Sequence, residues 1–142
     1  MSAEDNKALV GRYFSHFARH QLDEALDLLT EDLVWWIVGK PRLYPNAGLK
    51  TKADVARIFE RVDAFLPNWI EFTVHHVMAE GDRVAAEVES RGVARGGKPY
   101  NNTFAFFFVI RDGKIAEVRE YFDIMHAAEI FAPSTDSGEA RI

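Results

Sequence analysis

Glu120 is a carboxylate that falls among apolar residues, in a segment with the alternation of a β-strand. Counting by two along residues 114–123 puts Glu120 on the same strand face as Ala116, Val118 and Phe122. Burial of a carboxyl group raises its pKa unless a cation or a hydrogen-bond donor lies beside it. The pattern therefore predicts a candidate acid or base. It also allows a structural role, in which Glu120 pairs with an arginine such as Arg91 and only joins strands.

The elements that must position Glu120 are two long strands predicted within residues 100–123. Asp112-Gly113 supplies the tight turn between them, because glycine tolerates the positive φ of a short hairpin. The first strand is apolar on both faces, with Phe104, Phe106, Phe108 and Ile110 on one and Ala105, Phe107 and Val109 on the other. Such a strand is central in its sheet or is covered by a partner chain. We therefore expect the protein to self-associate.

Composition limits the kinds of protein that this chain can be. Its 142 residues are 48% hydrophobic, which fits one domain with room for a core and one pocket. Without cysteine there is no disulfide framework, thiolate metal site or cysteine nucleophile. The formal net charge of -5, without a Lys/Arg cluster, argues against a nucleic-acid partner. The polar, acidic beginning predicts neither a signal peptide nor a membrane span, so we expect a cytoplasmic protein with a small, mostly apolar ligand.

Two helices are predicted in the N-terminal part, over residues 3–20 and 23–29. The first has the i, i+3, i+4, i+7 stripe of an amphipathic helix, formed by Val10, Tyr13, Phe14 and Phe17. His16 and His20 lie four residues apart on this helix, a spacing that can bridge a metal ion. Because no HExxH context or third ligand accompanies them, we interpret them as surface side chains and predict no metal site.

The central part is predicted to contain a strand, a loop and a helix. Residues 33–38 are rich in aromatic and β-branched residues, with Trp35 and Ile37 on one strand face. Residues 39–51 contain two prolines and two glycines and predict a loop, which either closes over a pocket mouth or simply connects elements. Thr51 is predicted to cap a third helix that stops at Pro67.

Two more strands are predicted over residues 69–78 and 84–94. A regular strand would point the adjacent His75 and His76 to opposite faces, so they would not chelate one ion. By pattern alone, Glu87, Glu89 and Arg91 share a solvated face. The order of elements predicts an α+β fold, with helices packed on one side of a curved antiparallel or mixed sheet. We expect a single domain over residues 1–131 and a disordered tail over the small, polar residues 132–142.

With this order of elements, the chain resembles the nuclear-transport-factor-2-like (NTF2-like) superfamily. Within it, the chain is most similar to the SnoaL-like branch of polyketide cyclases, ketosteroid isomerases and limonene epoxide hydrolases. The resemblance covers residues 6–131 and is carried by Tyr100-Asn101-Asn102, Asp112-Gly113-Lys114-Ile115 and Glu120-Tyr121-Phe122-Asp123. It implies a cone in which three helices and a strongly bent sheet enclose an apolar cavity. It also implies a homodimer formed through the outer face of the sheet.

The resemblance also implies a set of site residues. It places Glu120 at a pocket carboxylate of the epoxide hydrolases, and Glu87 and Glu89 at their arginine and their other aspartate. Trp35 and Ile37 stand where that family has a water-binding tyrosine and asparagine, and these departures argue against epoxide hydrolysis. The remaining cavity residues that it implies are Arg91, Asn102, Phe104 and Phe122. The resemblance therefore places the strand face of Glu87 in the cavity, whereas the strand pattern alone places it on the surface.

Convergence of Glu87, Glu89 and Glu120 would keep at least one of them protonated near neutral pH, with Arg91 neutralising another. A protonated acid beside an ionised carboxylate suits the enolisation of a ketone. We therefore expect isomerase or cyclase chemistry on a small hydrophobic carbonyl compound, without a metal or an organic cofactor. The alternative hypothesis is a non-catalytic ligand-binding or dimerisation module of the same fold.

Overall fold

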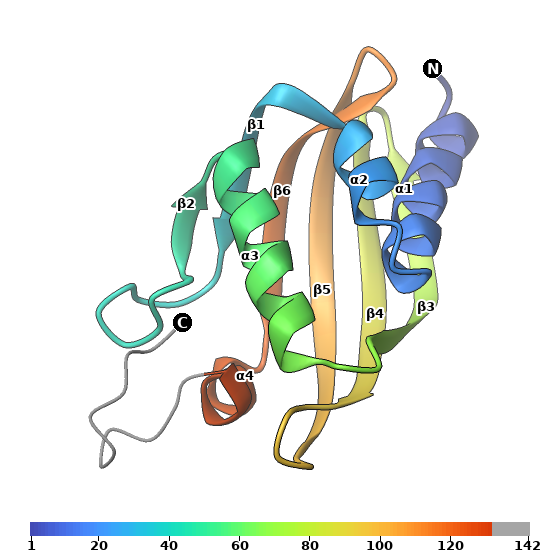
Figure 1. Ribbon diagram of the computed structural model, residues 1–142. Helices are drawn as coiled ribbons and strands as arrows, with labels where there is room; N and C mark the ends of the chain where they lie inside the picture. Colours follow the sequence, from blue (N-terminus) through green and yellow to red (C-terminus); the bar gives the residue numbers. More distant parts are fainter. Residues whose placement is uncertain (132–142) are drawn as a thin grey trace.

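The computed structural model describes residues 1–131 (Figure 1). Two helices come first, two strands and a third helix follow, and four consecutive strands then lead to a short last helix. The helices are α1 (Ala3–Ala18), α2 (Leu22–Asp27), α3 (Lys52–Phe65) and α4 (Ile124–Phe131). The strands are β1 (Leu29–Ile37), β2 (Gly48–Lys50), β3 (Ile70–Glu80), β4 (Arg83–Val93), β5 (Pro99–Arg111) and β6 (Lys114–Phe122). The tail expected to be disordered, residues 132–142, lies outside the described residues.

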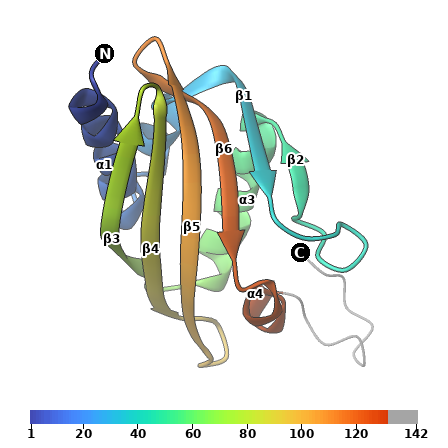
Figure 2. The same ribbon diagram turned by 180° about the vertical axis from the view of Figure 1, so that it is seen from behind.

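The six strands form one sheet in the order β2-β1-β6-β5-β4-β3. β1 runs parallel to β6, and every other neighbouring pair is antiparallel. Helices α1, α2 and α3 lie on one face of the curved sheet, whereas the other face is left uncovered by helices, as the two opposite views show (Figures 1 and 2). The predicted α+β fold with helices on one side of a mixed sheet is confirmed.

Local sequence signals explain where the long helices begin. Ser2 and Asp5 form a capping box before α1, and Thr51 and Asp54 form the same arrangement before α3. The predicted cap at Thr51 is therefore confirmed. The apolar stripe of α1 is buried against the sheet and consists of Leu9, Val10, Tyr13, Phe14 and Phe17.

Two elements were absent from the sequence prediction. β2 has only three residues, and it pairs with Trp35, Trp36 and Ile37 at the edge of the sheet. α4 follows directly after β6, where the Asp123 side chain accepts a hydrogen bond from the His126 backbone N–H. Both are too short to show a clear periodicity, so tertiary contacts decide their conformation.

The outer face of the sheet carries both His75 and His76, so the prediction that they point to opposite faces is wrong. The register of β3 against β4 shifts between Val74 and His76, and the extra residue of this bulge turns the alternation by one position. His75 contacts Glu89 at 3.0 Å, and His76 lies 3.8 Å from Glu87. Within residues 1–131, no group of three or more His, Asp or Glu side chains is arranged to hold a metal ion.

Candidate active site

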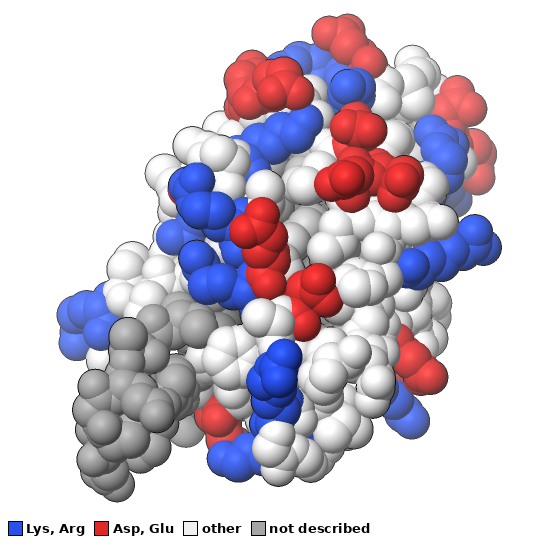
Figure 3. All heavy atoms as spheres, viewed as in Figure 1, with Lys and Arg blue, Asp and Glu red and all other residues white. Residues whose placement is uncertain are grey.

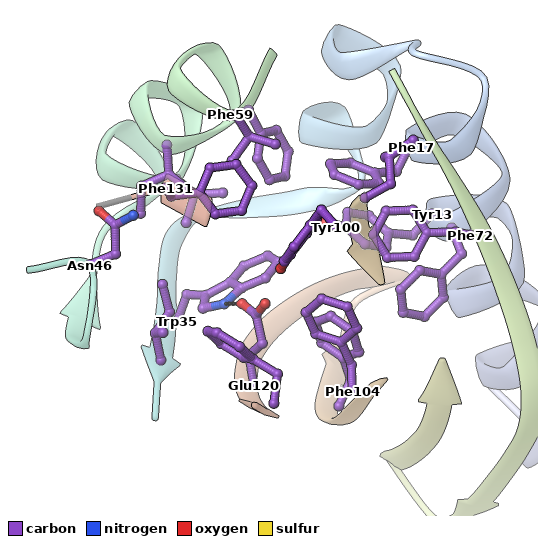
Figure 4. Close-up of a pocket in the computed structure, with 18 of the residues that line it drawn as sticks. Tyr13, Phe17, Trp35, Asn46, Phe59, Phe72, Tyr100, Phe104, Glu120 and Phe131 are labelled. Carbon is purple, nitrogen blue, oxygen red and sulfur yellow. Dashed lines mark hydrogen bonds between the residues drawn. The ribbon is translucent and has the colours of Figure 1, made fainter. Parts of the chain in front are cut away.

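Helices α1 and α3 cover the concave face of the sheet, with α4 at one end (Figure 1). Residues of these elements line a pocket of about 100 Å³ (Figure 4). Most of its wall is aromatic, because the inward positions of α1, β5 and β6 carry phenylalanine and tyrosine. Its lining residues include Phe14, Phe17, Phe59, Phe72 and Phe106. Phe131 of α4 packs edge-on against Tyr100, with ring centroids 4.7 Å apart, and closes the end that α4 covers.

Glu120 provides the carboxylate of the pocket. Its Oε1 accepts a hydrogen bond from the Trp35 indole Nε1 at 2.9 Å, and both side chains point into the pocket (Figure 4). Burial raises the pKa of Glu120 to about 7, whereas the hydrogen bond from Trp35 acts in the opposite direction and lowers it. No cation offsets the burial within residues 1–131, so the Arg91 pairing that the sequence left open is not formed.

The parallel pairing of β1 with β6 puts these two side chains together. Ile37 is the direct partner of Glu120 in the register, and Trp35 is the partner of Val118. Inward-facing residues of neighbouring strands lie on the same side of the sheet, so Trp35 reaches across to the carboxylate. The Oε2 atom of Glu120 has no hydrogen-bond partner among residues 1–131 and is available to a ligand in the pocket.

Three tyrosines, Tyr13, Tyr44 and Tyr100, line the same pocket as the carboxylate. Burial, together with the smaller effect of the negative charge of Glu120, raises the pKa of Tyr44 to about 12. Burial also raises the pKa of Tyr13 and of Tyr100 well above the usual range, with smaller contributions from Glu120 in both cases. Figure 4 shows the hydroxyl end of Tyr100 directed toward the end of the pocket that holds Glu120. These tyrosines therefore stay protonated near neutral pH and can donate hydrogen bonds to a ligand.

A second polar side chain of the pocket comes from the loop between β1 and β2. Asn46 is buried, and its Oδ1 accepts a hydrogen bond from Nη2 of Arg61, an exposed residue of α3, at 3.2 Å. The Asn46 amide acts against burial and lowers the pKa of the Tyr44 phenol. The pocket thus has a largely aromatic part and a polar part formed by Glu120, Trp35, Tyr44, Asn46 and Tyr100.

The structure brings together only some of the predicted site residues. Trp35, Ile37, Phe104 and Phe122 line the pocket with Glu120. Asn102 is buried behind the wall, where its Nδ2 lies 3.4 Å from the Tyr100 hydroxyl and its Oδ1 accepts hydrogen bonds from the backbone N–H groups of Thr103 and Asp123. Asn102 therefore supports the wall instead of facing the ligand.

The expected convergence of Glu87, Glu89 and Arg91 in the cavity is wrong. Residues of β4 alternate, and its inward positions are Val84, Ala86, Val88 and Ser90, all of which are buried. Glu87, Glu89 and Arg91 occupy the outward positions, as the strand pattern alone had indicated, and the side chain of Glu87 is 64% exposed. A hydrogen bond from His75 and the nearby charge of Arg91 lower the pKa of Glu89, so this carboxylate is ionised.

Sequence reasoning missed the tyrosines and Asn46. Tyr13 lay on the predicted apolar stripe of the first helix, where its hydroxyl was not considered. Tyr44 and Asn46 fall in the loop predicted over residues 39–51, for which closure over a pocket mouth was one of two interpretations. The signal was the presence of an aromatic and an amide side chain in that loop. Nothing in the pattern showed that both turn inward.

Known proteins show the same fold and related sequences. Residues 10–118 match the SnoaL-like domain. Two relatives from Dictyostelium discoideum, UPF0523 protein C and UPF0523 protein B, are 30% identical over 97 residues and 32% identical over 103 residues. These matches cover 63% and 66% of this chain, and the chain spans 58% and 60% of the relatives.

The structure is also similar to a solved NTF2-like protein of unknown function from Burkholderia pseudomallei. The TM-score is 0.79 at 19% sequence identity, and the superposition covers 94% of this chain and 100% of the other. The likeness at this identity concerns the fold: a mixed curved sheet with helices on one face. Together with the domain match over residues 10–118, it shows that the chain belongs to the SnoaL-like family of the NTF2-like superfamily.

Proposed function

We propose that the protein binds a small hydrophobic carbonyl compound in this pocket and that Glu120 moves a proton on the carbon next to the carbonyl group. The observation that carries the proposal is the placement of Glu120: a carboxyl group with a pKa of about 7, in the polar part of a largely aromatic pocket. A general acid or base works best when its pKa is close to the operating pH. Near neutrality, both forms of Glu120 are populated.

The proposed step needs no group beyond the chain and its substrate. The Glu120 carboxylate takes a proton from the carbon beside the carbonyl, which leaves an enolate and a protonated Glu120. Glu120 then returns this proton to a different carbon, which completes an isomerisation. In a cyclisation, the enolate carbon instead bonds to a second carbonyl carbon, and the resulting alkoxide takes the proton. Each route regenerates the Glu120 carboxylate.

Tyrosine hydroxyls replace the second carboxylate that the sequence led us to expect. An enolate needs a hydrogen-bond donor at its oxygen, and a donor in a site shielded from water stabilises it strongly. Glu87 and Glu89 face away from the pocket, whereas Tyr44 and Tyr100 line it together with Glu120. Their raised pKa values keep them protonated while Glu120 titrates.

The size of the pocket favours a ligand with a single ring. Its volume is about 100 Å³, whereas a dry engineered cavity of about 150 Å³ in another protein binds benzene. A ring of that size fits between the phenylalanine side chains only with small shifts of the wall. Larger substrates require the loop over residues 38–47 or α4 to move.

The test uses simple ketones as probes. Cyclohexanone reports proton removal through deuterium exchange in heavy water, and a β,γ-unsaturated cyclohexenone reports isomerisation to the conjugated ketone. We expect catalysis of both, with a rate that rises with pH around an apparent pKa of about 7. Glu120→Gln should lower the rate by roughly 10² to 10⁴-fold, which is the usual contribution of a positioned base. Glu117→Gln is the matched control, because Glu117 is exposed on the same strand.

A non-catalytic binding module is a second candidate, favoured by the hydrogen bond between Trp35 and Glu120. That bond gives the carboxylate a structural partner even without a substrate. In this case the ketones bind with similar affinity to wild type and to Glu120→Gln, and neither protein exchanges their protons above the buffer rate. If the wild type exchanges the protons of the ketones and Glu120→Gln does not, the hypothesis of a non-catalytic binding module is rejected.

A further inference from the structure

The side-chain amide of Asn46 is a polar group of the pocket that the proposed function does not use. Asn46 is only 7% exposed, and it lines the pocket together with Glu120. Its side chain carries an acceptor, Oδ1, and a donor, the Nδ2 amide group. Within residues 1–131, the side chain makes one hydrogen bond, which Oδ1 accepts from Nη2 of Arg61 at 3.2 Å. The amide nitrogen is therefore left without a partner among the described residues.

The contact with Arg61 fixes which side of the Asn46 amide faces the pocket. A guanidinium group can only donate, so the atom of Asn46 that it meets must be the oxygen. Arg61 is an exposed residue of α3, so the oxygen is directed toward this helix. Figure 4 shows the nitrogen of Asn46 on the opposite side of the amide, toward the pocket. The pocket wall thus presents an N–H donor at this point.

This nitrogen can be reached by a molecule in the pocket. Two side-chain atoms of residues 1–131 are fully buried without a partner, Oδ1 of Asn6 and Oγ1 of Thr30, and Nδ2 of Asn46 is not one of them. A ligand that brings an oxygen to Nδ2 satisfies the donor, whereas a ligand that brings only carbon leaves it without a hydrogen bond in a buried place. That difference is the usual source of specificity for a polar group on a ligand.

Asn46 and Glu120 are two separate polar points of the pocket. In the view of Figure 4, the side chain of Trp35 lies between them. Trp35 donates to Oε1 of Glu120, and Oε2 remains available to a ligand. One ligand can therefore meet Glu120 with the carbon that loses a proton and meet Asn46 with a different group.

From this geometry we infer that Asn46 donates a hydrogen bond to a second oxygen of the substrate. This oxygen is not the one of the carbonyl group beside which Glu120 removes the proton. The inference rests on the proposed function, and it narrows the substrate from small hydrophobic ketones in general to ketones that carry a further acceptor oxygen. Arg61 is a positioning residue, because it holds the oxygen of the amide toward α3 and so keeps the nitrogen toward the pocket.

The second acceptor is an uncharged oxygen, as in a ketone, an ester or an ether. An anionic group would lose its water in a pocket whose wall is mostly aromatic, and one neutral amide offsets little of that cost. Figure 3 shows basic and acidic side chains mixed over α3, so the charges on this helix partly offset one another. A neutral oxygen accepts the hydrogen bond from Asn46 at a smaller cost of desolvation.

The first arm of the test measures binding of three ketones that differ in the second oxygen. Cyclohexanone has none, tetrahydropyran-4-one has an ether oxygen in place of one ring CH₂ group, and cyclohexane-1,4-dione has an oxygen that extends beyond the ring. Asn46→Leu removes the amide at similar size. In NMR titrations, it should weaken the binding of the tighter of the two oxygen-containing probes by about threefold to tenfold, as for the loss of one neutral hydrogen bond. It should bind cyclohexanone as tightly as the wild type or more tightly.

Asn46→Asp is the second variant, since it retains the size and the acceptor for Arg61 and replaces the donor by an oxygen. It should lose affinity for the same probe at least as strongly as Asn46→Leu. In the wild type, the side-chain amide proton resonances of Asn46, identified by their absence from both variants, should shift more with that probe than with cyclohexanone. A residue that only stabilised the loop would weaken the binding of all three ketones together and would show no such difference.

Arg61→Met tests the positioning role, because it leaves the Asn46 amide free to rotate. We expect it to reduce the preference for the oxygen-containing probe over cyclohexanone by about twofold to threefold, and Arg61→Lys, which retains a donor, to restore part of this preference. Arg57→Met is the matched control. Arg57 lies one helical turn before Arg61 and is held by Asp54, so its loss should leave the preference unchanged.

The outcomes separate this inference from the proposed function. If Glu120→Gln loses the proton exchange of cyclohexanone while Asn46→Leu binds the three ketones in the wild-type ratio, the proposed function stands and the inference is wrong. If Glu120→Gln retains the exchange, the proposed function is wrong, whereas a selective loss of the oxygen-containing probe in Asn46→Leu still assigns the amide to a ligand oxygen. An equal loss of all three ketones in both Asn46 variants overturns the inference in either case.

Discussion

The Trp35 indole donates a hydrogen bond of 2.9 Å to Glu120, although the two residues lie 85 positions apart in the sequence. They come from β1 and β6, which form the parallel pair of the sheet. The indole N–H favours the charged carboxylate and so opposes the effect of burial on the pKa of Glu120. Trp35 therefore sets how readily the buried acid ionises.

Replacing Trp35 by phenylalanine should raise the pKa of Glu120 further above 7, because burial then acts alone. The midpoint of the rate against pH for ketone exchange should move upward, while the rate at high pH changes less. Trp36→Phe is the matched control, since Trp36 packs on Tyr121, an outward residue of β6, with centroids 5.3 Å apart. An unchanged midpoint in Trp35→Phe would mean that the hydrogen bond does not tune this group.

Glu120 should make the folded protein less stable as the pH rises. Its pKa is about 7 in the folded state against an ordinary value of 4.5, so between these values the folded state binds more protons than the unfolded chain. The free energy of unfolding must then fall as the pH rises through this window, by about 3 kcal/mol in total. Urea unfolding of Glu120→Gln should show a flatter pH dependence, and the variant should be more stable than wild type at pH values above the window.

Glu117→Gln is the control for the predicted pH dependence of stability. Glu117→Gln removes a carboxylate from the same strand at an exposed position, so its pH dependence should follow that of the wild type. If both variants show the wild-type slope between the two pKa values, Glu120 is not destabilised by burial, and the proton-transfer role loses its main support.

The strand pattern was sufficient to predict most of the sheet. In β5, Phe104, Phe106, Phe108 and Ile110 are inward and buried as expected, because alternation follows directly from the pleat of the backbone. For Glu87 and Glu89, the same pattern indicated the correct face, whereas the resemblance to other proteins reversed it. The resemblance transferred site positions from distant relatives, which assumes that their strands and β4 have the same register. In β4 that assumption fails, because Glu87 and Glu89 point outward.

The candidate site was predicted only in part because it depends on contacts between distant segments. Glu120 and Trp35 were identified as inward residues, yet their hydrogen bond requires the parallel β1–β6 register, which no local pattern shows. Tyr44 and Asn46 belong to a loop without periodicity, so their direction is decided by turns and by Arg61. The bulge at His75 could not be predicted from the sequence either, because one extra residue leaves the alternation of the strand unchanged on both sides of it.

Asn102 should matter for stability more than for ligand binding. It is 3% exposed, and its side chain joins β5 to Asp123 through both the backbone N–H and the backbone carbonyl of that residue. Asn102→Ala leaves these groups without their partner, so we expect a loss of about 2 to 3 kcal/mol in the free energy of unfolding. Urea titration measures this loss. A stable variant that fails to bind cyclohexanone would show instead that Asn102 contacts the ligand, as the resemblance had implied.

The outer face of the sheet is the surface through which we propose that the protein forms a homodimer. Phe107, at the centre of the sheet on β5, is 48% exposed, and it packs edge-on against Tyr121. The Arg119 guanidinium lies 4.1 Å from the Trp36 ring centroid beside them, so aromatic and cationic groups form one patch on this face. Exposed apolar groups on a central strand favour association.

Phe107→Glu should place two charges in the contact of a symmetric dimer and shift it to monomer in sedimentation velocity. Met125→Glu, at an 85% exposed site on α4, is the control with the same added charge, and a wild type that sediments as a monomer would contradict the proposal.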